Sequence, residues 1–149
     1  MNAPTSTLIV GIGNPARGDD GAGWAVVGRL DPGPWPDVEI RCQQQLQIED
    51  AADWSLRRRV IVIDASLDGP PVQCRRVGLD ASGAEIGTHR ADPRAIAALS
   101  RTLWGDSPEV ILCTVRGESF GFATELSAPV HHRVDQLAGE VLDLLRSAS

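Results

Sequence analysis

The fold is decided by residues 8–30, LIVGIGNPARGDDGAGWAVVGRL. The apolar run Leu8–Val10 predicts a buried strand. Glycines and the Asn14–Pro15 pair then predict a turn, and a segment with helical apolar spacing follows, which we expect to be a helix from Asp20 to Leu30. Together these form the opening strand, loop and helix of an α/β sheet, in which ligands bind at the carboxyl ends of the strands.

The loop in this stretch does not have the sequence of a nucleotide-binding loop. The third glycine comes too late for the dinucleotide fingerprint. Gly13 and Gly18 have the spacing of a phosphate-binding loop, but Asp19 and Asp20 stand where Lys and Ser or Thr are required. One of these two acids can be a helix cap, since acids are favourable at helix starts. The other can face a metal ion or a cationic group.

Seven further elements are expected, with strands at residues 38–42, 60–65, 73–77 and 109–115 and helices at residues 48–56, 93–104 and 128–146. The continuous β-branched run 60–65 is typical of a central parallel strand, and the alternating run 73–77 is typical of an edge strand. Asp92 before Pro93 predicts a helix start, and Gly105 predicts its end. Inward-facing positions are expected at Trp24, Val27, Leu30, Ile96, Leu99 and Leu103. No repeat is visible, so we expect one α/β domain over residues 1–149.

Composition excludes several classes of function. The net charge of −6 and the pI of about 4.9 argue against general nucleic-acid binding, and Arg57–Arg59 is expected to be a solvated edge. No apolar run approaches the ~20 residues of a membrane span, and no signal peptide is predicted. Cys42, Cys74 and Cys113 lie far apart, each in a predicted strand. We therefore expect buried free thiols and a cytoplasmic location.

Three polar residues are candidates for a site. Asp64 ends the central strand at the same edge as the Gly13 loop, and a charge that closes a buried strand must be paired, hydrogen-bonded or metal-bound. His89 lies in the loop before the helix 93–104; such a histidine is more often a surface residue than a ligand. With Asp20, these residues make two carboxylates and one imidazole, a set that can hold a divalent transition metal and leave coordination positions open.

The same residues also allow other chemistries. Asp20 and Asp64 could share a proton and activate water without a metal. The chain has no H-E-x-x-H helix, which argues against the commonest zinc-protease layout, and no Ser or Cys lies in a nucleophile elbow. The segment Gln43–Leu46 follows a predicted strand and is either near a ligand crevice or simply a polar loop.

Four stretches of the sequence, taken together, resemble the hydrogenase maturation proteases. They are GIGNPARGDDGAG at 11–23, VIVIDAS at 60–66, GTHRADP at 87–93 and VRGESFGFATELS at 115–127. These endopeptidases trim the C-terminus of the large subunit of nickel–iron hydrogenases. The resemblance covers nearly the whole chain, in the same order and at similar spacing.

The resemblance implies a three-layer fold: a twisted, mostly parallel sheet of about five strands with helices on both faces, of the phosphorylase/hydrolase-like type. It places the metal-anchoring set on Asp20, Asp64 and His89, with Asp19 as a candidate accessory acid. The resemblance further implies that the substrate supplies the nickel, with zinc or another divalent metal as a surrogate. It also implies a hydrogenase large-subunit precursor as partner, with no nucleotide, nucleic acid or membrane. A monomer is expected because no long apolar surface stripe is left unassigned.

Two departures from the family pattern bear on the site. Some relatives have Glu where this chain has Asp20, and Gln43–Leu46 matches the usual strand-end glutamine only loosely. The peptide-bond chemistry has two options: water attacking a metal-polarised carbonyl, or water activated by Asp19 or Asp20. The alternative function is a non-catalytic factor that binds a metal or the precursor on the same fold.

Overall fold

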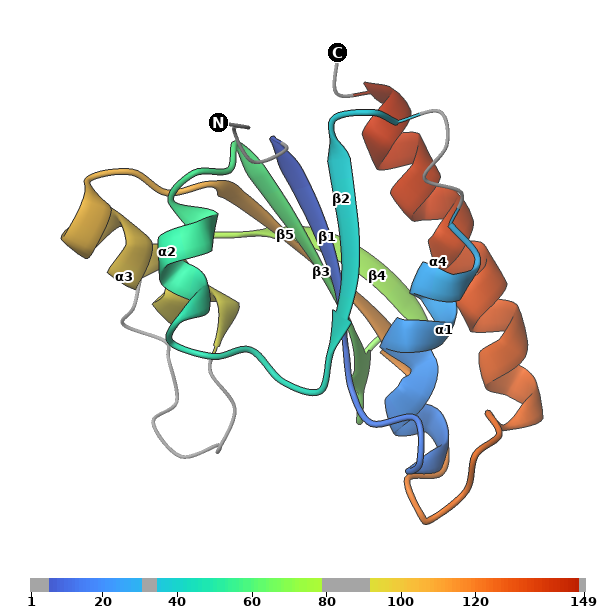
Figure 1. Ribbon diagram of the computed structural model, residues 1–149. Coiled ribbons are helices and arrows are strands. Elements are labelled where there is room, and N and C mark those ends of the chain that lie inside the picture. Colours follow the sequence, from blue (N-terminus) through green and yellow to red (C-terminus); the bar gives the residue numbers. More distant parts are fainter. Residues whose placement is uncertain (1–5, 31–34, 79–91, 148–149) are drawn as a thin grey trace.

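The computed structural model describes residues 6–30, 35–78 and 92–147, and its middle layer is one five-stranded sheet (Figure 1). The strands are β1 (Thr7–Ile12), β2 (Val38–Gln43), β3 (Arg59–Ser66), β4 (Val72–Val77) and β5 (Glu109–Arg116). They lie in the order β2-β1-β3-β5-β4. The neighbours β2, β1, β3 and β5 are parallel, and β4 runs antiparallel to β5 at the edge.

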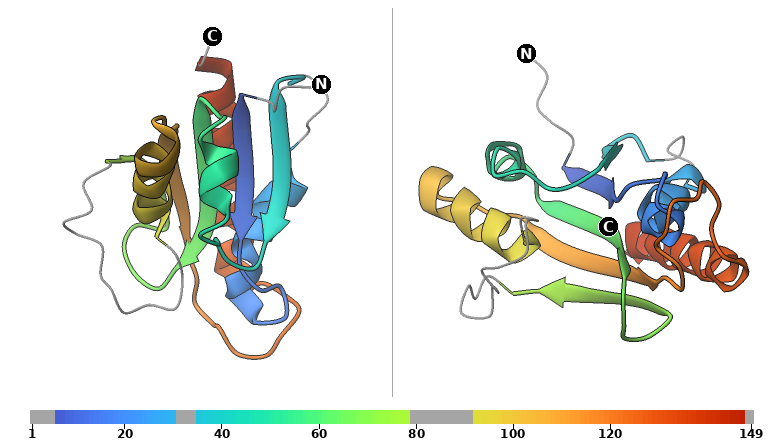
Figure 2. Two further views of the ribbon diagram at one scale, coloured as in Figure 1. Left: turned by 60° about the vertical axis from the view of Figure 1, so that its left-hand side comes forward. Right: turned by 90° about the horizontal axis from the view of Figure 1, so that it is seen from below.

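Helices cover both faces of the sheet (Figures 1 and 2). One face packs against α1 (Ala22–Gly28) and α4 (Ala128–Ser147), and the other against α2 (Asp50–Trp54) and α3 (Pro93–Trp104). A short 3₁₀ helix, η1 (Gly18–Gly21), precedes α1. The three-layer, mostly parallel α/β fold predicted from the sequence is therefore confirmed.

The central strands are buried on both faces, which explains their continuous apolar runs. In β3, Ile61 and Ile63 belong to the core under α1 and α4, while Val60 and Val62 belong to the core under α2 and α3. All four side chains are at most 1% exposed. A strand covered on both sides has no solvent face, so its sequence shows no alternation.

The predicted ends of α3 are confirmed. The carboxylate of Asp92 accepts a hydrogen bond from the Arg94 N–H at 2.9 Å, and Pro93 is the first helical residue. Gly105 ends the helix in the left-handed conformation, with φ of 79°. Glycine is favoured there because it has no Cβ to clash. The expectation that Leu103 faces inward is wrong, since this side chain is 61% exposed in the last turn.

The first helix begins later than predicted, and its predicted inner face is confirmed in part, since Leu30 is buried in the core and Val27 packs against it. Residues 18–21 form the 3₁₀ turn, and the buried positions of α1 are Ala22, Gly23 and Val26. Trp24 is half-buried and donates its indole N–H to the carbonyl of Gln43 at 2.9 Å. Gly23 faces the sheet, where a Cβ would lie 2.6 Å from the carbonyl oxygen of Ile12, so α1 approaches the strands closely.

Two other expectations need correction. Arg57 is only 5% exposed, not part of a solvated edge, because Glu39 and Asp53 each pair with its guanidinium at 2.9 Å. Paired charges can be buried where single ones cannot. Cys42 is exposed because β2 is an edge strand, whereas Cys113 is buried; the three cysteines are free thiols. Within the described ranges, no helix is long and apolar enough to cross a bilayer.

Candidate metal centre

The candidate site lies at the carboxyl edge of the sheet, where β1, β2, β3 and β5 all end, at the bottom of Figure 1. Two glycines bring η1 and α1 close to this edge. Gly13 has φ of 142°, and a Cβ there would overlap the carbonyl oxygen of Asp20. A Cβ on Gly23 would lie 2.5 Å from the carbonyl oxygen of Ile63. The loop after β1 therefore folds back tightly over the strand ends.

Asp20 is buried in η1 but borders two cavities at this edge. Its Oδ2 accepts a hydrogen bond from the Asn14 N–H at 2.9 Å, which fixes the carboxylate relative to the loop. One cavity of about 270 Å³ is lined by Arg17, Asp20, Ala65, Leu67 and Phe120. The other, of about 500 Å³, is lined by Asn14, Arg17, Asp20, Gln43, Gln44, Gln45 and Gln47. Asp20 and Arg17 are thus the residues that line both cavities.

Asp64 lies near the end of β3, opposite Thr114 of β5. It is half-buried, and its Oδ1 accepts a hydrogen bond from the Ala65 N–H at 2.8 Å. Ala65 lines the smaller of the two cavities that Asp20 borders. The structure thus brings both predicted acids to one edge of the sheet, from segments more than 40 positions apart.

The third predicted ligand, His89, lies outside the described residues. Within the described part of the chain, no group of three His, Cys, Asp or Glu side chains has an arrangement suited to a metal ion. The described residues therefore supply two carboxylates to the candidate centre, and the imidazole remains a prediction from the sequence.

Asp19 is directed differently from its neighbour and is fully buried. Its Oδ2 accepts hydrogen bonds from the N–H groups of Glu118 and Ser119 at 2.7 and 2.9 Å and from the Ser127 hydroxyl at 2.6 Å. Its Oδ1 accepts a fourth from the Ser127 N–H at 2.8 Å. Both oxygens are thus committed to the loop 117–127. This geometry favours a structural role for Asp19 over that of an accessory acid.

The surroundings of Asp19 keep it ionised. Burial alone would raise the pKa of this carboxyl. The hydroxyl of Ser127 and the N–H groups of Ser127, Glu118 and Ser119 outweigh that effect and hold the pKa below its usual value. Neither acid caps α1, whose N-cap is Gly21 with no side-chain hydrogen bond.

The loop 117–127 is also tied to η1 through its backbone. The N–H of Gly18 donates to the carbonyl of Ala123 at 2.7 Å, and the N–H of Asp19 donates to the carbonyl of Ser119 at 2.9 Å. The N–H of Ala123 in turn donates to Ala16 at 3.2 Å. One wall of the site is therefore held by hydrogen bonds between segments about 100 residues apart. The sequence does not predict these hydrogen bonds, because nothing in a single sequence links Asp19 to Ser127.

Gln43, at the strand-end position, has mainly structural contacts. Its carbonyl accepts hydrogen bonds from the Gly13 N–H and the Trp24 indole, and its side-chain amide donates to Asp50 at 3.2 Å. It also lines the larger cavity that Asp20 borders. Gln43 thus both borders a cavity and holds the loop in place, so each of the two interpretations of this segment is confirmed in part.

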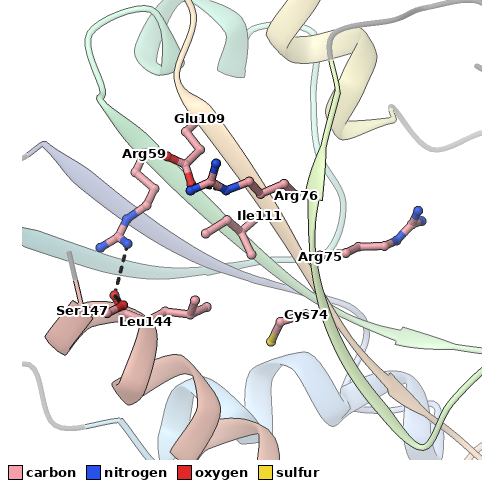
Figure 3. Close-up of a pocket in the computed structure, with 8 residues that line it drawn as sticks. All are labelled: Arg59, Cys74, Arg75, Arg76, Glu109, Ile111, Leu144 and Ser147. Carbon is pink, nitrogen blue, oxygen red and sulfur yellow. Dashed lines mark hydrogen bonds and ion pairs between the residues drawn. The ribbon is translucent and has the colours of Figure 1, made fainter.

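A further cavity of about 320 Å³ lies elsewhere, between α4 and the strands β3, β4 and β5 (Figure 3). Arg59 and Glu109 begin their strands, so this cavity opens toward the amino edge. Its charges are engaged: Arg76 pairs with Glu109 at 3.1 Å, and Arg59 donates to the carbonyl of Leu144 at 3.2 Å. Arg75 points away from it in Figure 3. Neither predicted acid borders this cavity.

Comparison with solved structures identifies the fold. The HycI protease from Thermococcus kodakarensis, a maturation protease for NiFe hydrogenase, superposes with a TM-score of 0.72 at 25% identity, over 95% of this chain and 93% of that one. The hydrogenase maturating endopeptidase HybD from E. coli gives a TM-score of 0.75 at 22% identity, over 96% and 93%. The chain has the fold of the hydrogenase maturation proteases.

A third structure, the hydrogenase 2 maturation peptidase from a Thaumarchaeota archaeon, gives a TM-score of 0.65 at 22% identity, over 93% and 97% of the two chains. No family model and no curated protein matches the sequence. The resemblance to the hydrogenase maturation proteases predicted from the four sequence stretches is therefore confirmed by structure, over almost the entire chain.

Proposed function

We propose that the protein is an endopeptidase that removes a C-terminal extension from the nickel-loaded precursor of a nickel–iron hydrogenase large subunit. The proposal is supported by a likeness that covers more than nine-tenths of both chains, to proteins named as maturation proteases and endopeptidases. The observation that carries it is the position of Asp20. This carboxylate borders two cavities at the edge of the sheet where Asp64 also ends its strand.

In this proposal, Asp20, Asp64 and His89 anchor the nickel ion that the precursor brings. Two carboxylates offset the charge of a divalent ion, and three protein ligands leave positions for groups of the precursor. The nickel is part of the substrate, so an unloaded precursor lacks the group that these residues recognise. When bound, a divalent ion can polarise the scissile carbonyl for attack by water.

The remaining features of the proposal concern the setting. The enzyme acts as a monomer in the cytoplasm, needs no nucleotide, and has the precursor as its protein partner. Zinc can stand in for nickel in binding experiments, because carboxylate and imidazole ligands suit both ions.

The test is incubation of purified protein with nickel-loaded precursor from the same genome, followed by intact-mass measurement of the precursor. The proposal expects loss of the C-terminal extension with the parent protein and none with Asp20→Asn. A complex that forms with the parent without any loss of mass would instead establish a non-catalytic binding factor on this fold.

Metal anchoring has its own measurement, which separates it from the acid pair that works without metal. Calorimetry measures the affinity for zinc of the parent and of Asp20→Ala. The variant should bind zinc at least about tenfold more weakly than the parent. Equal affinity of the two proteins for zinc and for nickel would exclude Asp20 as a ligand. Cleavage that persists in the presence of a strong chelator would favour the metal-free acid pair.

A further inference from the structure

The smaller cavity beside Asp20 has walls from three separate segments. Arg17 comes from the loop before η1, Ala65 and Leu67 come from the end of β3 and the turn after it, and Phe120 comes from the loop 117–127. Its volume is about 270 Å³. Pockets for whole small-molecule ligands span roughly 300–1,000 Å³, so this cavity better suits a single side chain.

The rim of this cavity exposes large apolar side chains. Leu67 is 79% exposed, and Phe122 is 92% exposed with the Arg17 guanidinium 5.7 Å from the centre of its ring. The chain has only two phenylalanines, Phe120 and Phe122, and neither is buried. Phenylalanine is among the residues most often buried, so the exposed Phe122 ring beside Arg17, which lines the cavity, indicates a surface for a partner.

The cavity is held in shape by the contacts that anchor its loop. The four hydrogen bonds to Asp19 and the backbone bonds to η1 fix the loop that carries Phe120. Gly117 leaves room for the Phe120 ring, since a Cβ there would lie 2.5 Å from it. A preformed cavity avoids part of the ordering cost when a guest binds.

The lining of the cavity combines two charged residues with apolar surface. Arg17 and Asp20 contribute one positive and one negative group, and the other three lining residues, Ala65, Leu67 and Phe120, supply apolar surface. Transfer of a charged side chain onto apolar walls carries a desolvation cost, whereas an aliphatic or aromatic one gains from burial.

We propose that this cavity is a specificity subsite, which binds an apolar side chain of the precursor within two residues of the scissile bond. This inference rests on the proposed function. It extends that function because the cavity shares Asp20 with the proposed metal anchor. If the precursor binds as an extended segment with its scissile bond near Asp20 and Asp64, a side chain next to that bond would lie in the cavity.

The test uses the nickel-loaded precursor with each of the four positions flanking the scissile bond replaced in turn by Leu and by Asp. Cleavage by the parent is compared with cleavage by Leu67→Ala and Phe120→Ala. Leu103→Ala is the matched control, since Leu103 is also an exposed leucine, but in α3. At one position the parent should prefer Leu over Asp in kcat/KM by about tenfold or more.

Leu67→Ala and Phe120→Ala should both weaken the preference for Leu over Asp, through a higher KM for the precursor that carries Leu. Leu103→Ala should keep the preference of the parent. Removal of the Phe120 ring should enlarge this cavity, so Phe120→Ala should also cleave a precursor with Trp at that position better than the parent does. Thermal unfolding shows whether Phe120→Ala folds. If Phe120→Ala does not fold, Leu67→Ala alone tests the subsite, because Leu67 is exposed and its loss should not affect folding.

The outcomes separate the two proposals. A parent that cleaves all variants with no preference at any position, or cavity variants that keep the full preference, would overturn the subsite and leave the endopeptidase intact. A parent that cleaves no precursor at all would overturn the proposed function, and the subsite with it.

Discussion

Asp19 and Asp20 are adjacent acids with different environments. Asp19 is satisfied by four hydrogen bonds from the loop 117–127, whereas Asp20 borders the cavities at the sheet edge. The sequence suggests a helix cap for one of the pair and a ligand for the other; the cap is wrong, since Gly21 is the N-cap of α1 and Asp19 instead holds the loop 117–127. The sequence alone could not predict this contact, because the partners of Asp19 lie about 100 positions away.

Replacement of each acid by Asn should therefore give opposite results. Asp19→Asn places an amide N–H₂ among donors and should lower the free energy of unfolding by on the order of 3 kcal/mol. Asp20→Asn keeps an acceptor for the Asn14 N–H, so it should change the free energy of unfolding by less than about 1 kcal/mol. Its rate of precursor cleavage should fall by at least about a hundredfold. Urea unfolding and precursor cleavage check this pair. Equal loss of stability in both variants would contradict the assignment.

Asp19 should also contribute to acid sensitivity. Its pKa is lower in the folded protein than in the unfolded chain, where it is about 3.9. Its stabilising effect is therefore complete above that pH and is lost as the pH falls through the folded-state pKa. The difference in unfolding temperature between parent and Asp19→Asn should be constant from about pH 5 to 7 and shrink below pH 4. A difference that stays constant down to pH 2 would exclude this role.

At the scale of elements, close approach of α1 to the sheet makes Gly23 irreplaceable. A Cβ there would lie 2.5 Å from the Ile63 carbonyl oxygen and 2.6 Å from that of Ile12. Gly23→Ala should lower the free energy of unfolding by more than about 2 kcal/mol. Gly139→Ala is the control: it lies in α4 with nothing within 4 Å of the added Cβ, and should stabilise by about 0.5–1 kcal/mol. Urea unfolding measures both, and a Gly23→Ala variant as stable as the parent would contradict this packing.

Most elements could be predicted from local sequence. The caps of α3 at Asp92, Pro93 and Gly105 lie where expected, because capping depends on adjacent residues. Burial was predicted less well. Leu103 is exposed, because burial in the last turn of α3 depends on where the neighbouring elements end. Arg57 is buried, because carboxylates in β2 and α2 pair with its guanidinium.

For the whole molecule, the fold could be predicted because each segment carries its own pattern and parallel strands share one carboxyl edge. The same rule brings Asp20 and Asp64 to one edge, as expected. The same rule places the loop 117–127, which follows β5, at this edge, but how the loop packs against η1 could not be predicted in this way. That packing depends on long-range hydrogen bonds to η1 that leave no periodic signal in the sequence.

The most direct test of the central claim compares nickel-loaded and nickel-free precursor, each incubated with the parent protein and followed over time by intact-mass measurement. Recognition of substrate-bound nickel predicts that the C-terminal extension is lost only from the loaded precursor, and that added nickel restores cleavage of the unloaded one. Cleavage of both precursors at the same rate would contradict nickel recognition.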